Sequence, residues 1–459
     1  MSSVRIIRCE AESPETVLDR ELKQFTASSP PQLLIAVDFA FETYWQTPVS
    51  RLALVALYHL IRRPDGVHVR VSVCAAENLQ TLPERDDSDW LQQLALAWFE
   101  LGQPLRLRPL SIPKPWGREI WYTGIEQRGV AAVCDGTREV PLPWLLAAAP
   151  QRYCHSLNRR LILLKILDPL PDQVFGDLYF ELHRDKREVY VVTSVDVEAW
   201  PDGVGAIRFG FDAELRTRYG DDARFLSEYR AAVSRYRQLR QEVDSLLDTR
   251  RASEDIEPAQ PVAATTLRRW LDELPASLRE QEREARVAME AFTGMLPLRV
   301  GDVVKVPRLV PHSLQHGVRT VEFQTPVYER LILSFAQKVL TQAHWDTDEA
   351  LDVLVLDPPP SEPFATTAEG DGWIEERIVE FDDFEVCRLT LQGGAERSLR
   401  APRDYSLCMA VGGMLQLGEL TLAADEAVLL PPVWRGGRVV NPDASTRVLL
   451  MAWPRIAYP

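Results

Sequence analysis

One short stretch of the chain combines two carboxylates with an imidazole. In GDLYFELHRDKREVYVV, residues 176–192, these groups belong to Glu181, His183 and Glu188. The 459 residues include only seven histidines, so this combination is uncommon here. Imidazole and carboxylate groups are ligands that zinc and related divalent cations accept. The stretch is therefore a candidate metal site, and the alternative is a solvated turn with weak surface ion pairs.

The alternation of residue types in this stretch predicts a β-hairpin with a turn at residues 184–187. In the expected register His183 faces Glu188, and Glu181 lies on the same face, because side chains along a strand alternate between two faces. Directly opposed side chains would then lie close enough to share one cation. The opposite face of the hairpin would be apolar, formed by Phe180, Leu182, Val189 and Val191.

A second stretch, GDVVKVPRLVPHSLQH at residues 301–316, carries a further candidate ligand. Its spacing, Gly301-x5-Pro307-x4-His312, predicts a strand, a sharp turn and a second strand that carries a ligand. Together the two stretches resemble the two motifs of the cupin superfamily, in which the ligands point into a small β-barrel. The resemblance implies that His312 joins Glu181, His183 and Glu188, and His316 is the alternative imidazole.

Further stretches make residues 113–459 similar to one cupin family, the type I phosphomannose isomerases. In chain order they are PKPWGREIW (113–121), LILLKILDPLP (161–171), KRE (186–188), VYERLILSFAQKVLTQAHWDTDEAL (327–351) and DDFEVCRLTL (382–391). The resemblance implies one Zn²⁺ ion and interconversion of mannose 6-phosphate and fructose 6-phosphate. It implies that the metal ligands are Glu181, His183, Glu188 and His312, and that Arg330 and Lys186 serve catalysis.

The chemistry of that reaction accounts for these residue types. Moving a carbonyl group between two sugar carbons passes through an enediolate, whose charge a Lewis-acidic cation and a nearby Arg stabilise. A general base must also move a proton, and His344, Lys186 and a water molecule are the open choices. Lys114 would line the phosphate pocket or have a structural role. The chain departs from the family in having Glu181 where a neutral Gln is usual, and a short link at 184–187.

These departures keep two other hypotheses open. The first is a metal-binding cupin of another class, which acts on a different sugar or serves as a sensor. The second is a protein with an inactive site that serves assembly or regulation. Convergence of several Arg or Lys side chains about a sugar's length from the metal would favour the isomerase.

The elements around these motifs predict a mainly β fold with two cupin, or jelly-roll, barrels. We expect a metal-binding cupin domain at residues 109–210 and 297–355, interrupted by a helical insertion at 211–296, and a second cupin-like domain at 356–459. Residues 1–108 predict a small α+β extension. Within it the expected elements are strands at 33–41 and 67–73 and helices at 49–61 and 89–102.

Composition limits the classes of partner. The net charge of −15 argues against binding to nucleic acid or a membrane surface, which normally requires a basic face. No apolar run approaches the ~20 residues of a membrane helix. The six cysteines form no CxxC pair, and the amino terminus lacks a signal-peptide pattern, so we expect a cytoplasmic protein with reduced thiols. The expected partner is a sugar phosphate, and the sequence gives no indication of oligomeric state.

Overall fold

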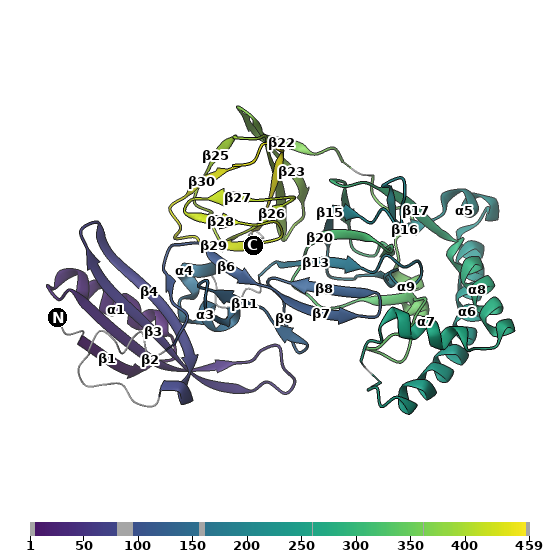
Figure 1. Ribbon diagram of the computed structural model, residues 1–459, viewed down its shortest axis with the longest axis horizontal. Helices are drawn as coiled ribbons and strands as arrows, with labels where there is room; N and C mark the ends of the chain where they lie inside the picture. Colours follow the sequence, from purple (N-terminus) through teal and green to yellow (C-terminus); the bar gives the residue numbers. More distant parts are fainter. Residues whose placement is uncertain (1–4, 80–94, 156–160, 259, 361, 456–459) are drawn as a thin grey trace. The chain divides into compact units, whose positions relative to one another are not determined.

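The computed structural model describes residues 5–79, 95–155, 161–258, 260–360 and 362–455. The chain divides into two compact units. Unit 1 comprises Met1–Leu110, Trp121–Leu164 and Phe364–Pro459, and unit 2 comprises Ser111–Ile120 and Lys165–Pro363. The fold is mainly β, as expected, with two cupin barrels and an inserted helical region (Figure 1).

The barrel of unit 2 consists of two sheets packed face to face. One sheet has the strand order β18 (Val303–Val306), β15 (Glu188–Val195), β20 (Val318–Gln324), β13 (Leu163–Pro169), β8 (Gly117–Trp121) and β7 (Leu110–Lys114). The other has the order β17 (Thr293–Leu298), β16 (Gly205–Phe211), β19 (His312–Leu314), β14 (Phe180–Leu182) and β21 (Leu331–Ser334). Residues of both sheets, among them Leu167, Tyr190, Ile207 and Leu314, fill the space between them.

Four helices separate β16 from β17 and form the expected insertion. They are α5 (Ala213–Tyr219), α6 (Asp222–Ser253), α7 (Ala264–Asp272) and α8 (Ala276–Glu290). The carboxylate of Asp221 caps α6 by accepting hydrogen bonds from the first free backbone N–H groups. An apolar stripe on α6, which includes Phe225, Tyr229 and Val233, packs against Leu182 and Leu333 of the five-stranded sheet, together with α9 (Thr347–Val353).

Unit 1 contains the second barrel. A long sheet has the order β12 (Glu139–Pro141), β11 (Ala132–Cys134), β6 (Leu105–Arg108), β29 (Ala427–Leu430), β26 (Ser406–Val411), β31 (Arg447–Pro454), β24 (Phe384–Leu391), β23 (Trp373–Glu380) and β22 (Ala365–Gly370). A shorter sheet has the order β25 (Glu396–Leu399), β30 (Gly437–Val440), β27 (Leu415–Leu417) and β28 (Leu420–Leu422). Residues 121–164, which the sequence placed with the metal-binding domain, fall in unit 1.

The amino-terminal part of unit 1 is an α+β structure. Its five strands are β1 (Arg5–Glu10), β2 (Gln32–Glu42), β3 (Arg51–Arg63), β4 (Gly66–Ala75) and β5 (Phe99–Glu100), with helix α1 (Pro14–Ala27). The helix predicted at 49–61 is wrong, because this segment is β3, which pairs with β2 and β4. Of the helix predicted at 89–102, residues 89–94 lie outside the described residues, and the prediction is wrong for residues 95–102, which include β5 and contain no helix.

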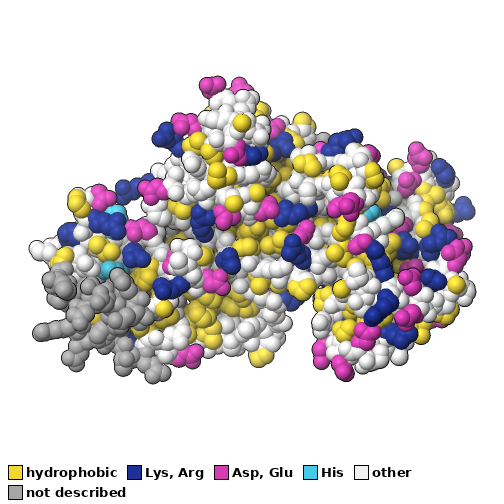
Figure 2. Space-filling model, viewed as in Figure 1, with side chains coloured by type: hydrophobic (Ala, Val, Ile, Leu, Met, Phe, Trp, Pro, Cys, Tyr) yellow, Lys and Arg dark blue, Asp and Glu magenta, His cyan; other side chains and the backbone are white. Residues whose placement is uncertain are grey.

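The surface carries charges of both signs. On the face seen in Figure 2, basic and acidic side chains are interspersed over the described residues. The described helices include none that is both long and apolar enough to cross a membrane.

Candidate metal centre

The stretch that carries Glu181, His183 and Glu188 does not form the predicted hairpin. Strand β14 pairs with β19 and β21, whereas β15 pairs with β18 and β20. The link at 184–187 therefore crosses from one sheet of the barrel to the other. The predicted alternation of faces is present, since Leu182 packs toward the helices while His183 points inward. The pairing was mistaken because alternation indicates which face a residue occupies and not which strand lies beside it.

The second motif folds as expected and brings His312 to the same place. Strand β18 ends at Val306, and β19 begins at His312 after a sharp turn. In that turn Leu309 has a φ of 65°, a left-handed conformation that favours glycine, and its N–H donates to the carbonyl of His183 at 2.7 Å. The turn thus ties the segment before His312 to the strand that carries His183.

Three of the four predicted ligands form one buried cluster. His183, Glu188 and His312 each offer a ligand atom within 4.8 Å of the others, and each is at most 2% exposed. Nε2 of His312 lies 3.1 Å from one oxygen of Glu188, and Nε2 of His183 lies 3.5 Å from the other. The three side chains come from both sheets, so the barrel itself positions them.

The orientation of both imidazoles fits a bound cation. Nδ1 of His183 lies 3.0 Å from the carbonyl oxygen of Glu329, and Nδ1 of His312 lies 3.1 Å from that of Val310. A carbonyl only accepts hydrogen bonds, so each Nδ1 carries a proton, and in a neutral imidazole Nε2 is then the nitrogen with the lone pair. The Nε2 of His183 is buried and has no hydrogen-bond partner in the described chain. Nitrogen lone pairs directed at the carboxylate of Glu188 would repel it. A positive charge between them removes this repulsion, and a divalent cation supplies such a charge.

Glu181, the fourth predicted ligand, is adjacent to the cluster but is not one of its three members. It is the register partner of His312 on the neighbouring strand. One of its oxygens lies 3.5 Å from the guanidinium of Arg330. Burial alone would raise the pKa of Glu181, but Arg330, Lys186 and other neighbouring groups lower it below its usual value. The assignment of Glu181 as a ligand stays a prediction.

Two side chains hold the carboxylate of Glu188. The Nζ of Lys186 lies 2.8 Å from one oxygen, and the hydroxyl of Tyr190 donates to the other at 2.6 Å. Burial opposes ionisation of Glu188, yet Lys186 and His183 bring its pKa well below the usual range. Burial and Lys186 lower the pKa of His183, which keeps the imidazole neutral as a metal ligand must be. The cluster therefore has a charged carboxylate and an unprotonated imidazole at neutral pH.

A second group of buried charges, which the sequence analysis missed, lies in the same barrel. The Nζ of Lys165 lies 3.2 Å from Glu322 and 3.8 Å from Glu119, and Lys114 lies 3.2 Å from Glu119. Glu322 is 1% exposed, and burial together with Glu188 raises its pKa well above the usual value. The available signal was a single charge inside an otherwise apolar strand, in LLKIL and in TVEF.

The contacts described for the remaining candidates are with residues other than the three of the cluster. His316 contacts Asp177 at 2.7 Å and stacks on Trp200, so it is held by other partners. His344 is exposed and pairs with Asp346. Arg330 lies over the ring of Tyr179, 4.3 Å from its centroid, and also donates to Thr341 at 2.7 Å.

Fold and cluster together define a cupin-type protein with a candidate metal centre. Among solved structures, mannose 6-phosphate isomerase from Bacillus subtilis has a TM-score of 0.50 and 15% identity, over 76% of this chain and 99% of that one. A variant of phosphomannose isomerase from Salmonella typhimurium has a TM-score of 0.49 and 12% identity, over 77% of this chain and 100% of that one. A zinc-bound mannose 6-phosphate isomerase has a TM-score of 0.48 and 12% identity, also over 77% of this chain and 100% of that one. At 15% identity the likeness to the Bacillus subtilis structure supports the fold alone. No family model matches the chain, and no curated protein matches it.

Proposed function

We propose that this chain is a metal-dependent aldose–ketose isomerase that acts on a sugar phosphate, with mannose 6-phosphate and fructose 6-phosphate as its substrates. The observation that carries the proposal is the buried cluster of His183, Glu188 and His312, with both imidazoles oriented by backbone carbonyls. The fold shared with the Bacillus subtilis isomerase supports the choice of substrate. The six cysteines are free, which supports a location in the reducing cytoplasm.

His183, Glu188 and His312 would hold the cation, and zinc is the first choice because it accepts two imidazoles and a carboxylate. Three protein ligands leave a coordination position for water or a sugar oxygen, as in catalytic zinc sites. The bound cation would act as a Lewis acid toward the sugar oxygens as the enediolate forms. Glu181 is a fourth ligand if it exchanges its contact with Arg330 for one with the metal.

The surrounding side chains supply positive charge and a site for a proton. Arg330 is held over Tyr179 and would bind negative charge on the substrate. Lys186 lies 2.8 Å from Glu188 and holds its carboxylate in place. The amine of Lys186 is also one of the candidates for the general base. The structure adds Glu322 to these choices, because its buried carboxyl lies beside Lys165 and accepts a proton more readily than an ordinary glutamate.

A coupled assay with mannose 6-phosphate tests the proposal. We expect formation of fructose 6-phosphate, loss of that activity after chelation, and its return on adding Zn²⁺, Mn²⁺, Co²⁺ or Fe²⁺. The best metal in that series identifies the preferred ion. Protein that retains one equivalent of metal but converts none of the sugar phosphate would overturn the isomerase assignment.

One observation favours a second candidate, a metal-binding cupin that binds a sugar without isomerising it. Glu181 offsets the charge of Arg330 at 3.5 Å, at a position where the resembled family has a neutral Gln. An arginine already paired with a carboxylate binds an anionic substrate less strongly. Calorimetry on the metal-loaded protein distinguishes the two candidates, since this second one predicts saturable sugar binding without turnover. Glu181→Gln would then raise the affinity for sugar phosphates.

A further inference from the structure

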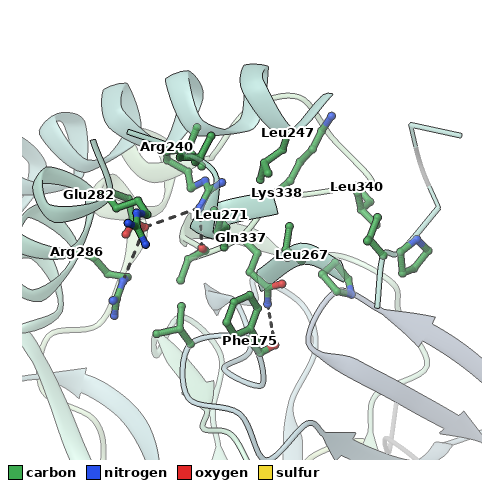
Figure 3. A pocket seen from close by; sticks show the side chains of 18 of the residues that line it. Phe175, Arg240, Leu247, Leu267, Leu271, Glu282, Arg286, Gln337, Lys338 and Leu340 are labelled. Carbon is green, nitrogen blue, oxygen red and sulfur yellow. Dashed lines mark hydrogen bonds and ion pairs between the residues drawn. The ribbon is translucent and has the colours of Figure 1, made fainter. Parts of the chain in front are cut away.

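Unit 2 contains a separate cavity of about 220 Å³ between the helical insertion and two loops of the barrel (Figure 3). Helices α6, α7 and α8 line one side, and residues 173–175 and 336–340 line the other. The loops are joined by a hydrogen bond of 2.8 Å from the side chain of Gln337 to the carbonyl of Phe175. The lining includes neither the metal cluster nor Arg330, so the cavity is distinct from the proposed active site.

Most of the wall is apolar. Its main contributors are Phe175, Val243, Leu247, Leu267, Leu271 and Leu340. A dry cavity of about 150 Å³ with a similar lining is large enough to take up benzene. This cavity therefore has room for the body of a small aromatic or branched aliphatic molecule.

The polar part of the wall is mainly cationic. Arg240, Arg279, Arg286 and Lys338 line the cavity, and each pairs with a carboxylate: Asp244, Asp272, Glu282 and Asp248, respectively. Arg286 makes two long contacts, with Glu282 at 3.9 Å and with Glu290 at 3.7 Å, and its buried Nε has no hydrogen-bond partner in the described chain. Figure 3 shows Glu282 between Arg240 and Arg286, so one carboxylate serves two guanidinium groups.

Arg251, in the last turn of α6, is bound differently. It is 7% exposed, and its guanidinium donates to two backbone carbonyls, of Glu257 at 3.4 Å and Gln260 at 2.7 Å. Burial lowers its pKa, and Asp248 and Asp244 offset this effect only in part. Within the described part of the chain, the hydrogen-bond partners of Arg251 are carbonyls and not carboxylates. Such a buried cation is costly, and an anion from outside the chain would compensate it.

We propose that this cavity binds a small organic carboxylate, with its head group at Arg251 and its apolar body against the leucine-rich wall. A single incompletely compensated arginine matches a monoanion better than a phosphate monoester, which carries nearly two negative charges. The apolar wall excludes inorganic anions as good occupants, because they would leave it unfilled. The proposal is independent of the metal cluster and of isomerase activity.

Titration of the full-length, metal-loaded protein with 4-fluorobenzoate, followed by fluorine NMR, tests this site. We expect saturable binding of one molecule per chain. 4-Fluorobenzamide, which has the same shape without the charge, should bind at least tenfold more weakly, and phenyl phosphate should bind no more tightly than the carboxylate. Absence of saturable binding, or equal binding of the neutral amide, would overturn the proposal. Tighter binding of phenyl phosphate would overturn the choice of a carboxylate.

Variants locate the bound molecule. Arg251→Met should weaken binding of 4-fluorobenzoate at least tenfold, whereas Arg250→Met, at a half-exposed neighbour that pairs with Glu273, should change it less than twofold. Leu271→Trp fills the cavity without removing Arg251, so it should also weaken binding of 4-fluorobenzoate. If Arg251→Met does not fold, this variant tests whether the molecule binds in the cavity. His312→Ala should leave the affinity unchanged. Equal losses in the Arg251 and Arg250 variants, or loss only in His312→Ala, would overturn the assignment to this cavity.

Discussion

The interiors of the two barrels differ in chemistry although both are built from two stacked sheets. The barrel of unit 1 is filled by apolar and thiol side chains, such as Leu389, Leu391, Cys408 and Leu449. The barrel of unit 2 shares this kind of packing in part but also encloses the His–Glu–His cluster and the Lys165–Glu322 pair. Among the described residues, no group of buried histidine and carboxylate side chains like that of unit 2 lies in the first barrel.

The stability of the fold therefore does not explain why the second barrel contains buried charged groups. Removing charged groups from water costs several kcal/mol per ion, and a well-packed apolar interior is often at least as stable as a buried ion pair. Groups with strongly shifted pKa values gather where they serve binding or catalysis. Under the proposed function, the polar interior of unit 2 serves metal binding, and the variants below test whether the two interiors differ in this way.

The largest effect is expected from His312→Ala, which removes one of three ligand atoms. Metal content should fall from about one equivalent to below a tenth, because the two remaining ligands do not enclose a cation. Glu188→Gln should do the same, and the barrel should remain folded in both variants. The measurement is elemental analysis after dialysis, with circular dichroism as the check on folding.

His316→Ala is the matched control, since His316 is buried in the same unit but is bound by Asp177 and Trp200. It should keep its metal. Undiminished zinc in His312→Ala, or equal loss from both variants, would contradict the proposed ligand set.

The next effect concerns stability. Lys165→Met leaves Glu322, 1% exposed, without its close cation, and should lower the free energy of unfolding by about 3–5 kcal/mol in urea denaturation. Glu119 keeps a partner in Lys114. The double variant Lys165→Met/Glu322→Gln should recover much of the loss, because the unpaired charge is then gone. A single variant as stable as the parent would mean that the pair is already open to water.

In the barrel of unit 1, the corresponding change should act through packing alone. Leu389→Ala removes a fully buried side chain and should cost about 2–4 kcal/mol through lost burial and the cavity that remains. Metal content should not change. Met414→Ala, at a position 39% exposed, is the control and should cost less than about 0.5 kcal/mol. A loss of metal in Leu389→Ala would show that the two interiors are coupled.

The sequence predicted those features of the two barrels that depend on the local pattern of residues. The order of strands, helical insertion and strands was correct, and the spacing of the two motifs brought His183, Glu188 and His312 to one cluster. These features follow from alternation, from helical periodicity and from the spacing of Gly301, Pro307 and His312 around a turn.

Features that depend on distant partners could not be predicted. The partner strands of β14 and β15 are more than a hundred residues away in the chain, so the local pattern favoured a hairpin that does not exist. Lys165 and Glu322 are separated by more than 150 residues, and each is a charged residue between two apolar neighbours in its strand. Residues 52–58 within the segment 49–61 are apolar throughout, and such a run does not distinguish a buried strand from a buried helix.

Tyr190 is another residue that the sequence did not single out, and its variant should show the smallest effect. Tyr190→Phe removes the hydrogen bond of 2.6 Å to Glu188 and should cost about 1 kcal/mol of stability. Because a bonded carboxylate is also held in position, metal affinity should fall about tenfold in a competition titration with a chelator. Tyr58→Phe in unit 1 removes a similar buried bond of 2.6 Å, to the carbonyl of Ala148, and should reduce stability alone. Equal metal affinities in the two variants would show that the Tyr190 hydroxyl supports the barrel and not the site.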